Sequence, residues 1–570
     1  MRDTDSCRKL YDRWLEMLDP ADPLAQELEG VRGDIPQITD RFYQDIGFGT
    51  AGLRGICGAG TNRMNRFTVG RASLGIARYV LASGEDASRG IAIAYDCRHH
   101  SKEFSQLTAG VFAAAGIPVY IFPSMRPTPE LSFVIRQLHC VAGVNMTASH
   151  NPKEYNGYKV YWKDGAQISG PASEGMQREI EALDIFGHVP EIPLEEAEEK
   201  GLVHTLGEEQ DEAYMQYVLS LRQRSDEQLD LSIPIVYTPL NGAGSIPMRE
   251  MARRRGFSAF QTVVQQQDPD PDFTSVPYPN PENPQAFALA EELGKSTGAQ
   301  LLIATDPDSD RMAAEIADGK GGFLPLTGNQ TGALLIDYMA RAQTENGHLH
   351  AGGRRPAMIK SIVTDDFGAA VCRHYGISVF EALTGFKNIC GRIPELEEKG
   401  YSYFFGYEES IGCAPGAAVR DKDGIAAAML LAEWAAYCQK RGVSLAGALE
   451  ELSEEYGYYL EKESSLVLAG ADGKEKIEAI MQHFRSAPPE NPGPCRLKEV
   501  IDFQHGHGDI PPQNALIFRM VDGSWFAMRP SGTEPKLKFY VYTVSRDRAE
   551  AASRLAGLDD AIRREVERMS

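Results

Sequence analysis

The sequence predicts a multidomain α/β protein, and three observations support this prediction. Short apolar runs typical of buried strands alternate with helix-like segments along most of the chain. With 570 residues the chain is too long for one hydrophobic core, and about 100 to 200 residues per domain gives about three to five domains. The hydrophobic fraction of 42% and the charged fraction of 24% are ordinary for a folded protein. We therefore expect mostly parallel sheets with helices on both faces.

The first part of the chain predicts a helix followed by a sheet. Residues 8–18 form an amphipathic helix in this interpretation, because their apolar side chains fall on one helical stripe: Leu10, Trp14, Leu15 and Leu18. We expect this helix to pack on the body of the protein rather than to bind a partner. After a glycine-rich loop at 48–55, the apolar segments 91–94, 119–122 and 141–144 are predicted strands.

Changes in composition divide the rest of the chain. An acidic, proline-containing segment at 189–207 precedes a helix-like stretch near Asp211, and later units show strands at 233–237, 301–304, 515–518 and 537–542 and a helix at 331–340. Prolines exclude regular structure at 268–284, which we expect to be a functional loop. The predicted domains are 1–207, 208–323, 324–455 and 456–570.

Charge and cysteine content limit the compartment and the partners. The formal net charge of -22 argues against a nucleic-acid or anionic-membrane partner. The nine cysteines are scattered without C-x-x-C spacing, which is typical of reduced thiols in the cytosol. The N-terminus lacks the apolar core of a signal peptide, and the apolar run 425–432 is too short to span a membrane. We expect a soluble cytoplasmic protein with no membrane partner.

Ser149 follows the apolar strand at 141–144 and lies in the segment Thr147-Ala148-Ser149-His150-Asn151-Pro152. Ligands of open α/β sheets bind at the carboxyl ends of strands, so this serine is a candidate for covalent chemistry, provided that a neighbour activates it. A hydrolase is a weaker interpretation, because the G-x-S-x-G motif is absent and an adjacent histidine rarely serves as the base. Taken alone, the motif is equally consistent with a capping turn.

Three aspartates, Asp306, Asp308 and Asp310, follow the apolar strand at 301–304. Side chains at alternate positions of an extended segment point the same way, and carboxylate-only ligation selects a hard cation. An EF-hand would require glycine and glutamate where the chain has Arg311 and Ala317, so we expect magnesium rather than a calcium sensor. A solvated acidic turn is the alternative for this motif alone.

Further polar residues suggest phosphate and sugar recognition. Lys159 follows a turn that can return it toward Ser149, and Arg54 offers a positive charge in a glycine-rich loop. The loop 529–536 combines basic, hydroxyl and glycine residues that suit a phosphate dianion, although a basic surface turn has the same composition. Glu408 and Ser410 share one face if the segment is extended and would then bond sugar hydroxyls; otherwise they mark a solvated strand end.

Four motifs, taken together and in this order, resemble the α-D-phosphohexomutase superfamily of phosphoglucomutases and phosphomannomutases over nearly the entire chain. They are the segments 147–152, 306–311, 406–410 and 529–533. The region 41–55 resembles, more narrowly, the longer branch with bacterial phosphoglucomutases and eukaryotic phosphopentomutase-like enzymes. The resemblance implies four domains around a central cleft: three related α/β domains with mixed sheets and a smaller C-terminal α+β domain similar to the TATA-binding protein.

The same resemblance implies roles for individual residues. Ser149 would be the phosphoserine, Mg²⁺ would be held by Asp306, Asp308, Asp310 and the serine phosphate, and His150, Lys159 and Arg54 would complete the catalytic group. Lys159 would be the general acid/base, and we expect burial beside a metal to lower its pKa. The implied substrate-binding residues are Arg311, Thr384, Gly385, Lys387, Glu408, Ser410, Lys422, Arg529, Ser531, Gly532, Thr533 and Lys536.

The implied activity is that of an intramolecular phosphotransferase of the isomerase class. It would interconvert glucose 1-phosphate and glucose 6-phosphate through glucose 1,6-bisphosphate, which also serves as activator. Many dual-specificity and glucosamine mutases carry Gly-His after the sugar-loop serine, whereas this chain has Ile411-Gly412-Cys413, which favours glucose. Phosphomannomutase, phosphopentomutase, bisphosphate synthase and phosphatase activities, and an inactive scaffold, are the alternatives. We expect a phosphosugar substrate and a monomer or homodimer.

Overall fold

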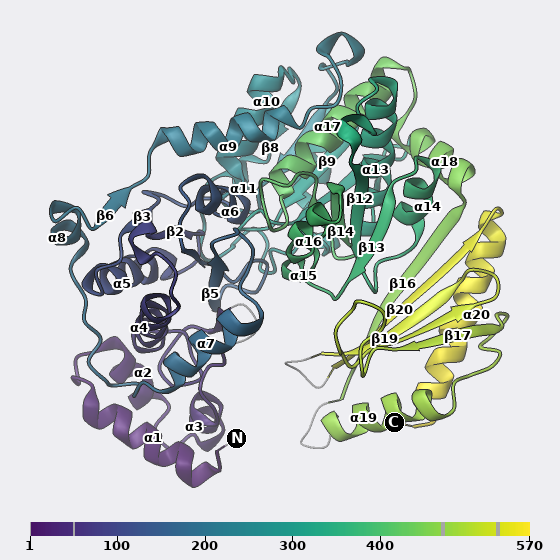
Figure 1. The fold of residues 1–570 in the computed structure, drawn as a ribbon. Coiled ribbons are helices and arrows are strands. Elements are labelled where there is room, and N and C mark those ends of the chain that lie inside the picture. The colour runs from purple at the N-terminus through teal and green to yellow at the C-terminus, as the bar shows by residue number, and fades with distance from the viewer. Residues whose placement is uncertain (1, 49–51, 469–472, 532–535, 570) are drawn as a thin grey trace. The chain divides into compact units, whose positions relative to one another are not determined.

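The computed structural model of this chain describes residues 2–48, 52–468, 473–531 and 536–569 (Figure 1). The chain forms two compact units, one of residues 1–326 with 412–441 and the other of residues 327–411 with 442–570. Among the described residues, no helix combines the length and the apolar character that a membrane span requires.

The chain begins with the helices α1 (Thr4–Met17), α2 (Pro23–Gly30) and α3 (Ile35–Phe42). The predicted first helix is confirmed, but it starts earlier than expected because Asp3 caps it by accepting a hydrogen bond from the Ser6 amide. Trp14 is fully buried, and its ring packs edge-on against the rings of Phe42, Phe67 and Phe186. The helix therefore packs on the body of the first unit, as expected.

The first sheet has the strand order β1-β5-β4-β2-β3-β6. Its strands are β1 (Gly52–Ile56), β2 (Ile91–Tyr95), β3 (Val119–Ile121), β4 (Ala142–Met146), β5 (Tyr155–Trp162) and β6 (Val203–Thr205). The run from β4 to β6 is parallel, whereas β5 is antiparallel to both of its neighbours. The sheet is thus mixed, as the resemblance implied. The expectation of a mostly parallel sheet is wrong at this edge, because β4 and β5 are joined by a hairpin.

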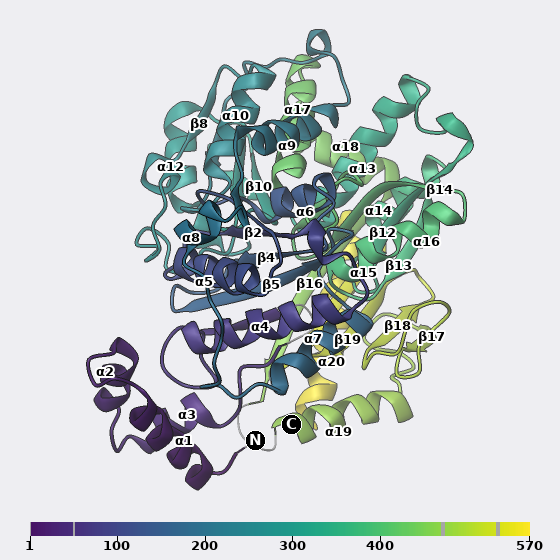
Figure 2. The same ribbon diagram turned by 60° about the vertical axis from the view of Figure 1, so that its left-hand side comes forward.

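Helices cover both faces of this sheet (Figure 2). One face packs with α4 (Arg66–Ala82), α5 (Ser101–Ala114), α7 (Gly170–Glu181) and α8 (Leu194–Glu199), in a core that includes Val69, Phe112, Met176 and Ala197. The other face packs with α6 (Thr128–Gln137), through Leu131, Val134 and Ile135. A short 3₁₀ turn, η1 (Ala87–Arg89), precedes β2.

The second sheet, in the same unit, has the order β11-β10-β9-β7-β8. Its strands are β7 (Ile235–Thr238), β8 (Phe260–Thr262), β9 (Leu301–Thr305), β10 (Met312–Ala317) and β11 (Phe323–Pro325). Here too a hairpin breaks the parallel run, since β9 pairs in parallel with β7 but antiparallel with β10. The accompanying helical elements are α9 (Glu208–Ser220), η2 (Asp226–Gln228), α10 (Ser245–Arg255), α11 (Val264–Gln267), η3 (Pro284–Phe287) and α12 (Ala288–Thr297).

A later segment of the chain belongs to this unit as well. It carries β15 (Gly412–Ala414) and the almost fully buried helix α17 (Gly424–Lys440), which contacts β9 and β10. Residues 268–283 form neither helix nor strand, as their prolines predicted.

The second unit begins with a parallel arrangement in which β12 (Arg355–Ser361) lies between β13 (Ser378–Ala382) and β14 (Tyr401–Glu408). Its helical elements are α13 (Gly328–Glu345), η4 (Ala351–Gly353), α14 (Phe367–His374), α15 (Phe386–Gly391), α16 (Ile393–Glu398) and α18 (Leu445–Tyr456). The predicted helix at 331–340 is therefore confirmed as the central part of α13.

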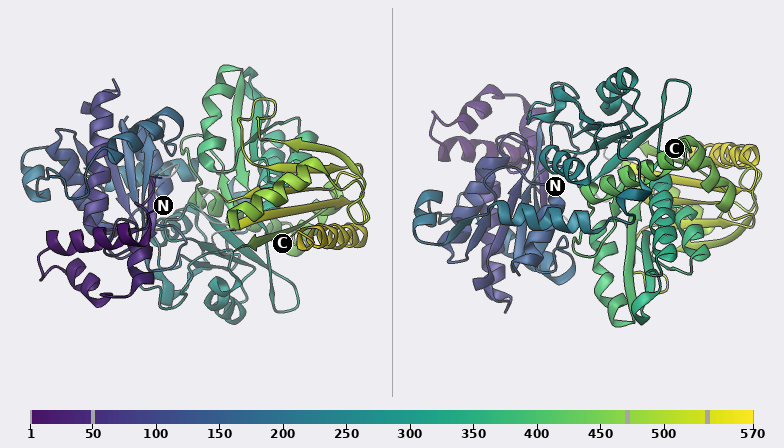
Figure 3. Two further views of the ribbon diagram at one scale, coloured as in Figure 1. Left: turned by 90° about the horizontal axis from the view of Figure 1, so that it is seen from below. Right: turned by 90° about the horizontal axis from the view of Figure 1, so that it is seen from above.

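The last part of the chain is an antiparallel sheet of order β16-β20-β19-β18-β17. Its strands are β16 (Tyr458–Val467), β17 (Leu497–Asp502), β18 (Leu516–Met520), β19 (Trp525–Pro530) and β20 (Lys536–Ser545). Alternate side chains such as Phe518 and Phe526 pack under α19 (Gly473–Ser486) and α20 (Arg548–Glu567), which both cover one face (Figure 3). This is the α+β domain that the resemblance implied.

Candidate active site

Two hairpin loops meet in the first unit. Ser149 lies in the loop between β4 and β5, and the three aspartates lie in the loop between β9 and β10. The Ser149 hydroxyl donates a hydrogen bond of 2.5 Å to Oδ2 of Asp306, and both residues are buried. The predicted serine and the predicted acidic cluster therefore form one site, although 157 positions separate them in the sequence.

The backbone at Ser149 is held in a left-handed conformation, with φ of 52°. This conformation is uncommon for serine and persists only where the surroundings enforce it. Arg98 supplies much of that enforcement: its guanidinium donates to the carbonyls of Ser149 (2.6 Å), Pro152 (2.8 Å) and Tyr155 (3.1 Å), and also to that of Asn151. The serine loop thus encloses a buried arginine.

Asp96 completes this arrangement, because its Oδ2 lies 3.3 Å from Nε of Arg98 and both side chains are fully buried. Neither residue was predicted from the sequence. A signal was present, since Asp96 directly follows β2, which is the parallel neighbour of β4, and its side chain therefore emerges at the same sheet edge as Ser149.

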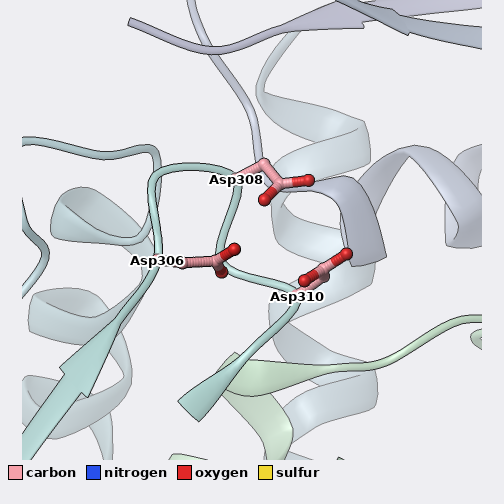
Figure 4. A group of neighbouring side chains, drawn as sticks. All are labelled: Asp306, Asp308 and Asp310. Atoms are coloured by element: carbon pink, nitrogen blue, oxygen red, sulfur yellow. The ribbon is translucent and has the colours of Figure 1, made fainter. Parts of the chain in front are cut away.

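Asp306, Asp308 and Asp310 converge, with one oxygen of each within 4.8 Å of the others (Figure 4). All three are essentially inaccessible to solvent, at 0%, 0% and 1% exposure. Oδ1 of Asp308 and Oδ1 of Asp310 have no hydrogen-bond partner among the described residues. Buried carboxylate oxygens without donors are costly unless a cation compensates them, so this all-oxygen set fits a hard divalent ion such as magnesium.

Thr128, which lies at the start of α6 in the first domain, holds Asp308 in place through two hydrogen bonds. Its hydroxyl donates 2.7 Å to Oδ2 of Asp308, and its amide donates 2.9 Å to the Asp308 carbonyl. Asn145 in turn donates to the Thr128 hydroxyl at 2.7 Å. Thr128 was also missed by the sequence analysis, because nothing in its local pattern indicates a partner 180 positions away.

Two lysines face the aspartates. Nζ of Lys159 lies 2.5 Å from Asp308 and 3.1 Å from Asp310, and Nζ of Lys422 lies 3.1 Å from Asp310. We expected the surroundings of Lys159 to lower its pKa, but the neighbouring side chains raise it. Burial does lower its pKa, but Asp308 and Asp310 outweigh burial, and the pKa is raised. Lys159 is therefore an ammonium in this site.

The aspartates themselves differ in charge state. Burial, followed by the charges of Asp308 and Asp310, raises the pKa of Asp306 well above its ordinary value. Burial acts the same way on Asp308, but Lys159 more than compensates and holds the pKa of Asp308 below its ordinary value. The hydroxyl of Ser149 thus meets the carboxyl group of the cluster that ionises least readily.

His150, Arg54 and Arg311 lie around the serine, as expected. Nδ1 of His150 is 3.2 Å from Oγ of Ser149, and burial together with Arg311 and Arg54 lowers the pKa of His150 to about 2, so its imidazole is neutral. Arg54, on β1, donates to Asn151 at 3.3 Å. The amide of Arg311 donates to Asp306 at 3.0 Å.

The proline-rich loop at 268–283 contributes to the same neighbourhood. Asp272 accepts a hydrogen bond of 3.1 Å from Lys153, and the ring of Phe273 lies 5.1 Å from the guanidinium carbon of Arg98. The ring of Tyr278 is 6.5 Å from that of His150. These contacts place the segment beside the serine loop, and its functional role stays a prediction.

The second unit holds the remaining predicted residues. Glu408 accepts a hydrogen bond of 2.6 Å from the Gly385 amide, and Arg529 donates to the Thr384 hydroxyl at 2.7 Å. The condition of an extended segment through Ser410 is not met, because β14 ends at Glu408 and a turn follows. Glu408 and Ser410 therefore do not continue on one face of a strand.

The predicted phosphate loop connects β19 and β20. The Ser531 amide donates 2.7 Å to the Lys536 carbonyl, which closes the base of this hairpin. Burial lowers the pKa of Lys387, on α15. Gly532 and Thr533 lie outside the described residues.

Three α/β domains, a serine held against an acidic triad and a C-terminal α+β domain together define a class of phosphosugar mutases. Four family models match the chain. They describe alpha/beta/alpha domain I at 45–185, domain II at 212–320, domain III at 327–456 and the C-terminal domain at 471–554 of phosphoglucomutase/phosphomannomutase. The chain belongs to the phosphoglucomutase/phosphomannomutase family.

Relatives of similar length support this assignment. The chain is 36% identical over 555 residues to the phosphoglucomutase of Staphylococcus aureus strain MSSA476, covering 95% of this chain and 97% of that one. It is 38% identical over 542 residues to the phosphoglucomutase of Staphylococcus epidermidis strain RP62A, covering 93% and 96%. The crystal structure of the phosphoglucomutase pp63/parafusin from Paramecium shares the fold, with a TM-score of 0.69 at 18% identity over 92% and 95% of the two chains.

Proposed function

We propose that this protein is a phosphoglucomutase that interconverts glucose 1-phosphate and glucose 6-phosphate through a phosphorylated Ser149 and glucose 1,6-bisphosphate. The observation that carries the proposal is the 2.5 Å contact between the Ser149 hydroxyl and the buried acidic triad. The family membership and the names of the staphylococcal relatives support the choice of sugar. In this proposal the domains are 1–207, 208–323, 324–455 and 456–570.

Asp306, Asp308, Asp310 and a phosphate on Ser149 would hold Mg²⁺, whose charge would offset the negative charge on the transferring phosphoryl group. The chain itself does the positioning. Arg98 and Asp96 hold the serine loop, and Thr128 orients Asp308. Holding reactants in a near-attack geometry accounts for much of the rate enhancement in phosphoryl transfer.

In the forward reaction, the bond between Ser149 Oγ and phosphorus breaks as the O6 hydroxyl of glucose 1-phosphate forms its own bond to phosphorus. Lys159, whose Nζ is an ammonium in the site, would protonate the departing Oγ of Ser149 and, as the neutral amine that results, take the O6 proton. The bisphosphate then turns end for end, and its other phosphate returns to Ser149. Arg54 and the neutral His150 flank the serine, so that Arg54 stabilises negative charge there.

The second unit would recognise the rest of the substrate. Glu408, Ser410 and the loop with Thr384, Gly385 and Lys387 would bond sugar hydroxyls, and Arg311 and Lys422 would add positive charge. Arg529, Ser531, Gly532, Thr533 and Lys536 would hold the phosphate that is not reacting. Turning the intermediate requires that this grip be released and re-formed once in each turnover.

The cysteine thiols support a cytoplasmic location for the protein. All nine cysteines are free, which suits the reducing cytoplasm. We take the protein to be a monomer or homodimer that acts on phosphosugars, with no nucleic-acid or membrane partner.

The decisive experiment compares kcat/KM for the 1-phosphates of glucose, mannose, glucosamine and ribose in the presence of Mg²⁺ and glucose 1,6-bisphosphate. The kcat/KM for glucose 1-phosphate should exceed the kcat/KM for each of the other three substrates by about tenfold or more. A higher kcat/KM for mannose or ribose 1-phosphate would make the protein a phosphomannomutase or phosphopentomutase. Accumulation of inorganic phosphate instead of the 6-phosphate would identify a phosphatase.

A further inference from the structure

A separate cavity of about 390 Å³ lies in the first unit. Its walls are the first turn of α6 with the segment before it, the first half of α9, and α10 with the residue Ala243 before it. None of the residues that we assign to the mutase reaction lines it. About half of the lining is apolar: Met125, Tyr214, Met215, Ala243, Ile246 and Pro247. Its volume falls within the range of pockets that bind small organic ligands, about 300–1,000 Å³.

The polar part of the lining carries an excess of negative charge. Five carboxyl side chains face two guanidinium groups. Arg126 is paired with Asp211 at 2.8 Å, and Arg254 is shared between Glu212 at 2.6 Å and Glu250 at 2.5 Å. Glu208 lies exposed in the first turn of α9. A ligand that enters this cavity therefore meets uncompensated negative charge at its rim.

Glu130 lies inside, 2% exposed, and its Oε1 has no hydrogen-bond partner among the described residues. The nearest cation, Nε of Arg126, is 3.8 Å away, beyond hydrogen-bond distance. Burial and then a hydrogen bond with Asp211 raise the pKa of Glu130 well above its ordinary value, so it is a neutral acid that shares its proton with Asp211. Oε1 still lacks a donor among the described residues, which a ligand N–H group would supply.

We propose that this cavity binds a small organic amine, with its apolar body against Tyr214, Met215 and Ile246 and its ammonium group donating to Glu130 and the carboxylates at the rim. An anion is disfavoured by the charge, and a fully apolar ligand would leave Glu130 unsatisfied. This inference does not rest on the proposed function, because binding is measurable without any phosphosugar.

The cavity walls are hydrogen-bonded to the aspartate loop, and we infer from this that the amine site is an effector site. The Ala243 amide donates 2.8 Å to the carbonyl of Pro307, between the first two aspartates. Thr128, two positions before Glu130, holds Asp308 by backbone and side chain. A ligand that fills the cavity contacts both walls while these walls are hydrogen-bonded to the aspartate loop, and so stabilises that position of the loop. Amine binding therefore strengthens cation binding, and the linkage is reciprocal.

Isothermal titration calorimetry of the full-length protein tests the binding step, with phenethylamine as the probe and 2-phenylethanol as its uncharged counterpart. Phenethylamine should bind, with the alcohol at least about tenfold weaker. Ile246→Trp, which fills the cavity from an exposed position, should abolish amine binding, and Glu208→Lys should weaken it about tenfold. The control variant Leu324→Ser replaces an exposed leucine outside the cavity. This variant should bind phenethylamine with the same Kd as the wild-type protein.

Equal binding of amine and alcohol, absence of amine binding, or unchanged affinity in both cavity variants would overturn the proposal. If Ile246→Trp lowers the melting temperature of the protein, its loss of binding is set aside. The affinity of Glu208→Lys for phenethylamine, and the difference in affinity between phenethylamine and 2-phenylethanol, then test the proposal. The coupling is tested by titrating Mn²⁺ calorimetrically with and without saturating phenethylamine. The Kd for Mn²⁺ should fall by about fivefold or more. An unchanged Kd would show that the cavity is no effector site.

Discussion

The guanidinium of Arg98 and the backbone carbonyl of Ser149 are joined by a hydrogen bond of 2.6 Å, inside a loop whose serine has a positive φ. Because the same guanidinium reaches three further carbonyls of the loop, a single buried side chain determines where the serine oxygen lies relative to Asp306. The position of the Ser149 hydroxyl thus depends on a residue that lies outside the acidic cluster.

Replacing Arg98 by lysine should lower kcat by about 10- to 100-fold, because an ammonium cannot bond four carbonyls in fixed directions. The KM for glucose 1-phosphate should stay within about twofold, since the substrate contacts are intact. Steady-state kinetics with Arg13→Lys, an exposed arginine paired with Asp184, provides the matched control. A rise in KM with kcat preserved would show that Arg98 acts on substrate binding instead.

Removing the serine hydroxyl in Ser149→Ala should abolish mutase turnover while leaving the melting temperature within a few degrees, since the lost atom is small. Incubation with labelled glucose 1,6-bisphosphate should label the wild-type protein and leave this variant unlabelled. Residual turnover near the wild-type rate would rule out the covalent route.

Thr128→Val removes the hydroxyl that donates to Asp308 while keeping the shape of the side chain. Groups that orient metal ligands typically account for 10- to 100-fold in affinity, so we expect the Kd for Mg²⁺ or Mn²⁺ to rise by about that factor. Thr128→Ser retains the hydroxyl and should restore binding, which separates orientation from packing. Calorimetric cation titrations of the three proteins make the comparison. Equal affinities would show that Thr128 has only a structural role.

Chelation of divalent cations should eliminate turnover, and added Mg²⁺ should restore it, because the triad is a set of oxygen ligands with two unsatisfied oxygens. The comparison is made by dialysing the protein against EDTA and then titrating Mg²⁺ while following the rate. Full activity after exhaustive chelation would contradict the assignment of the triad as a metal site.

Arg529→Ala should raise the KM for glucose 1-phosphate by about tenfold or more, because it removes a guanidinium from the proposed phosphate clamp. Ser149 should remain phosphorylatable by the bisphosphate, since Arg529 belongs to the other unit. Lys538→Ala, on the adjoining strand β20, is the control for a lost surface charge. An unchanged KM in Arg529→Ala would remove this loop from the substrate site.

Glu315, on β10, should make stability fall with rising pH. Burial and then Glu291 raise its pKa to about 7, so the folded state holds this proton more tightly than the unfolded chain does. The stabilisation is complete below about pH 4.5 and is lost as the pH rises through about 7. Glu315→Gln should therefore be more stable than wild type by about 3 kcal/mol at pH 8 and show little gain at pH 4.5. Urea unfolding at both pH values, with the exposed Glu199→Gln as control, measures this; a gain of equal size at both pH values would contradict it.

Local sequence patterns were sufficient to predict most of the fold. The apolar runs at 91–94, 141–144 and 301–304 became β2, β4 and β9, because buried strands need continuous apolar residues. Asp306, Asp308 and Asp310 converge as predicted, but for another reason: the segment is a turn, with Ser309 at φ of 55° and its amide donating to the Asp306 carbonyl, and not an extended segment. At Glu408 and Ser410 a turn likewise follows the strand, so the condition of an extended segment is not met there.

Only the tertiary structure decided which residues distant in sequence come into contact. It also decided the charge that each of these side chains carries. Asp96, Arg98 and Thr128 carry no motif, and their importance arises because strands and a helix from two domains bring them against the Ser149 and Asp308 loops. The charge of Lys159 was set in the same way. Burial alone would lower its pKa, but two carboxylates from another domain outweigh burial and raise it above its ordinary value. Spacing along a chain fixes the direction of side chains over a few residues, whereas electrostatics depends on distance in space, which folding alone establishes.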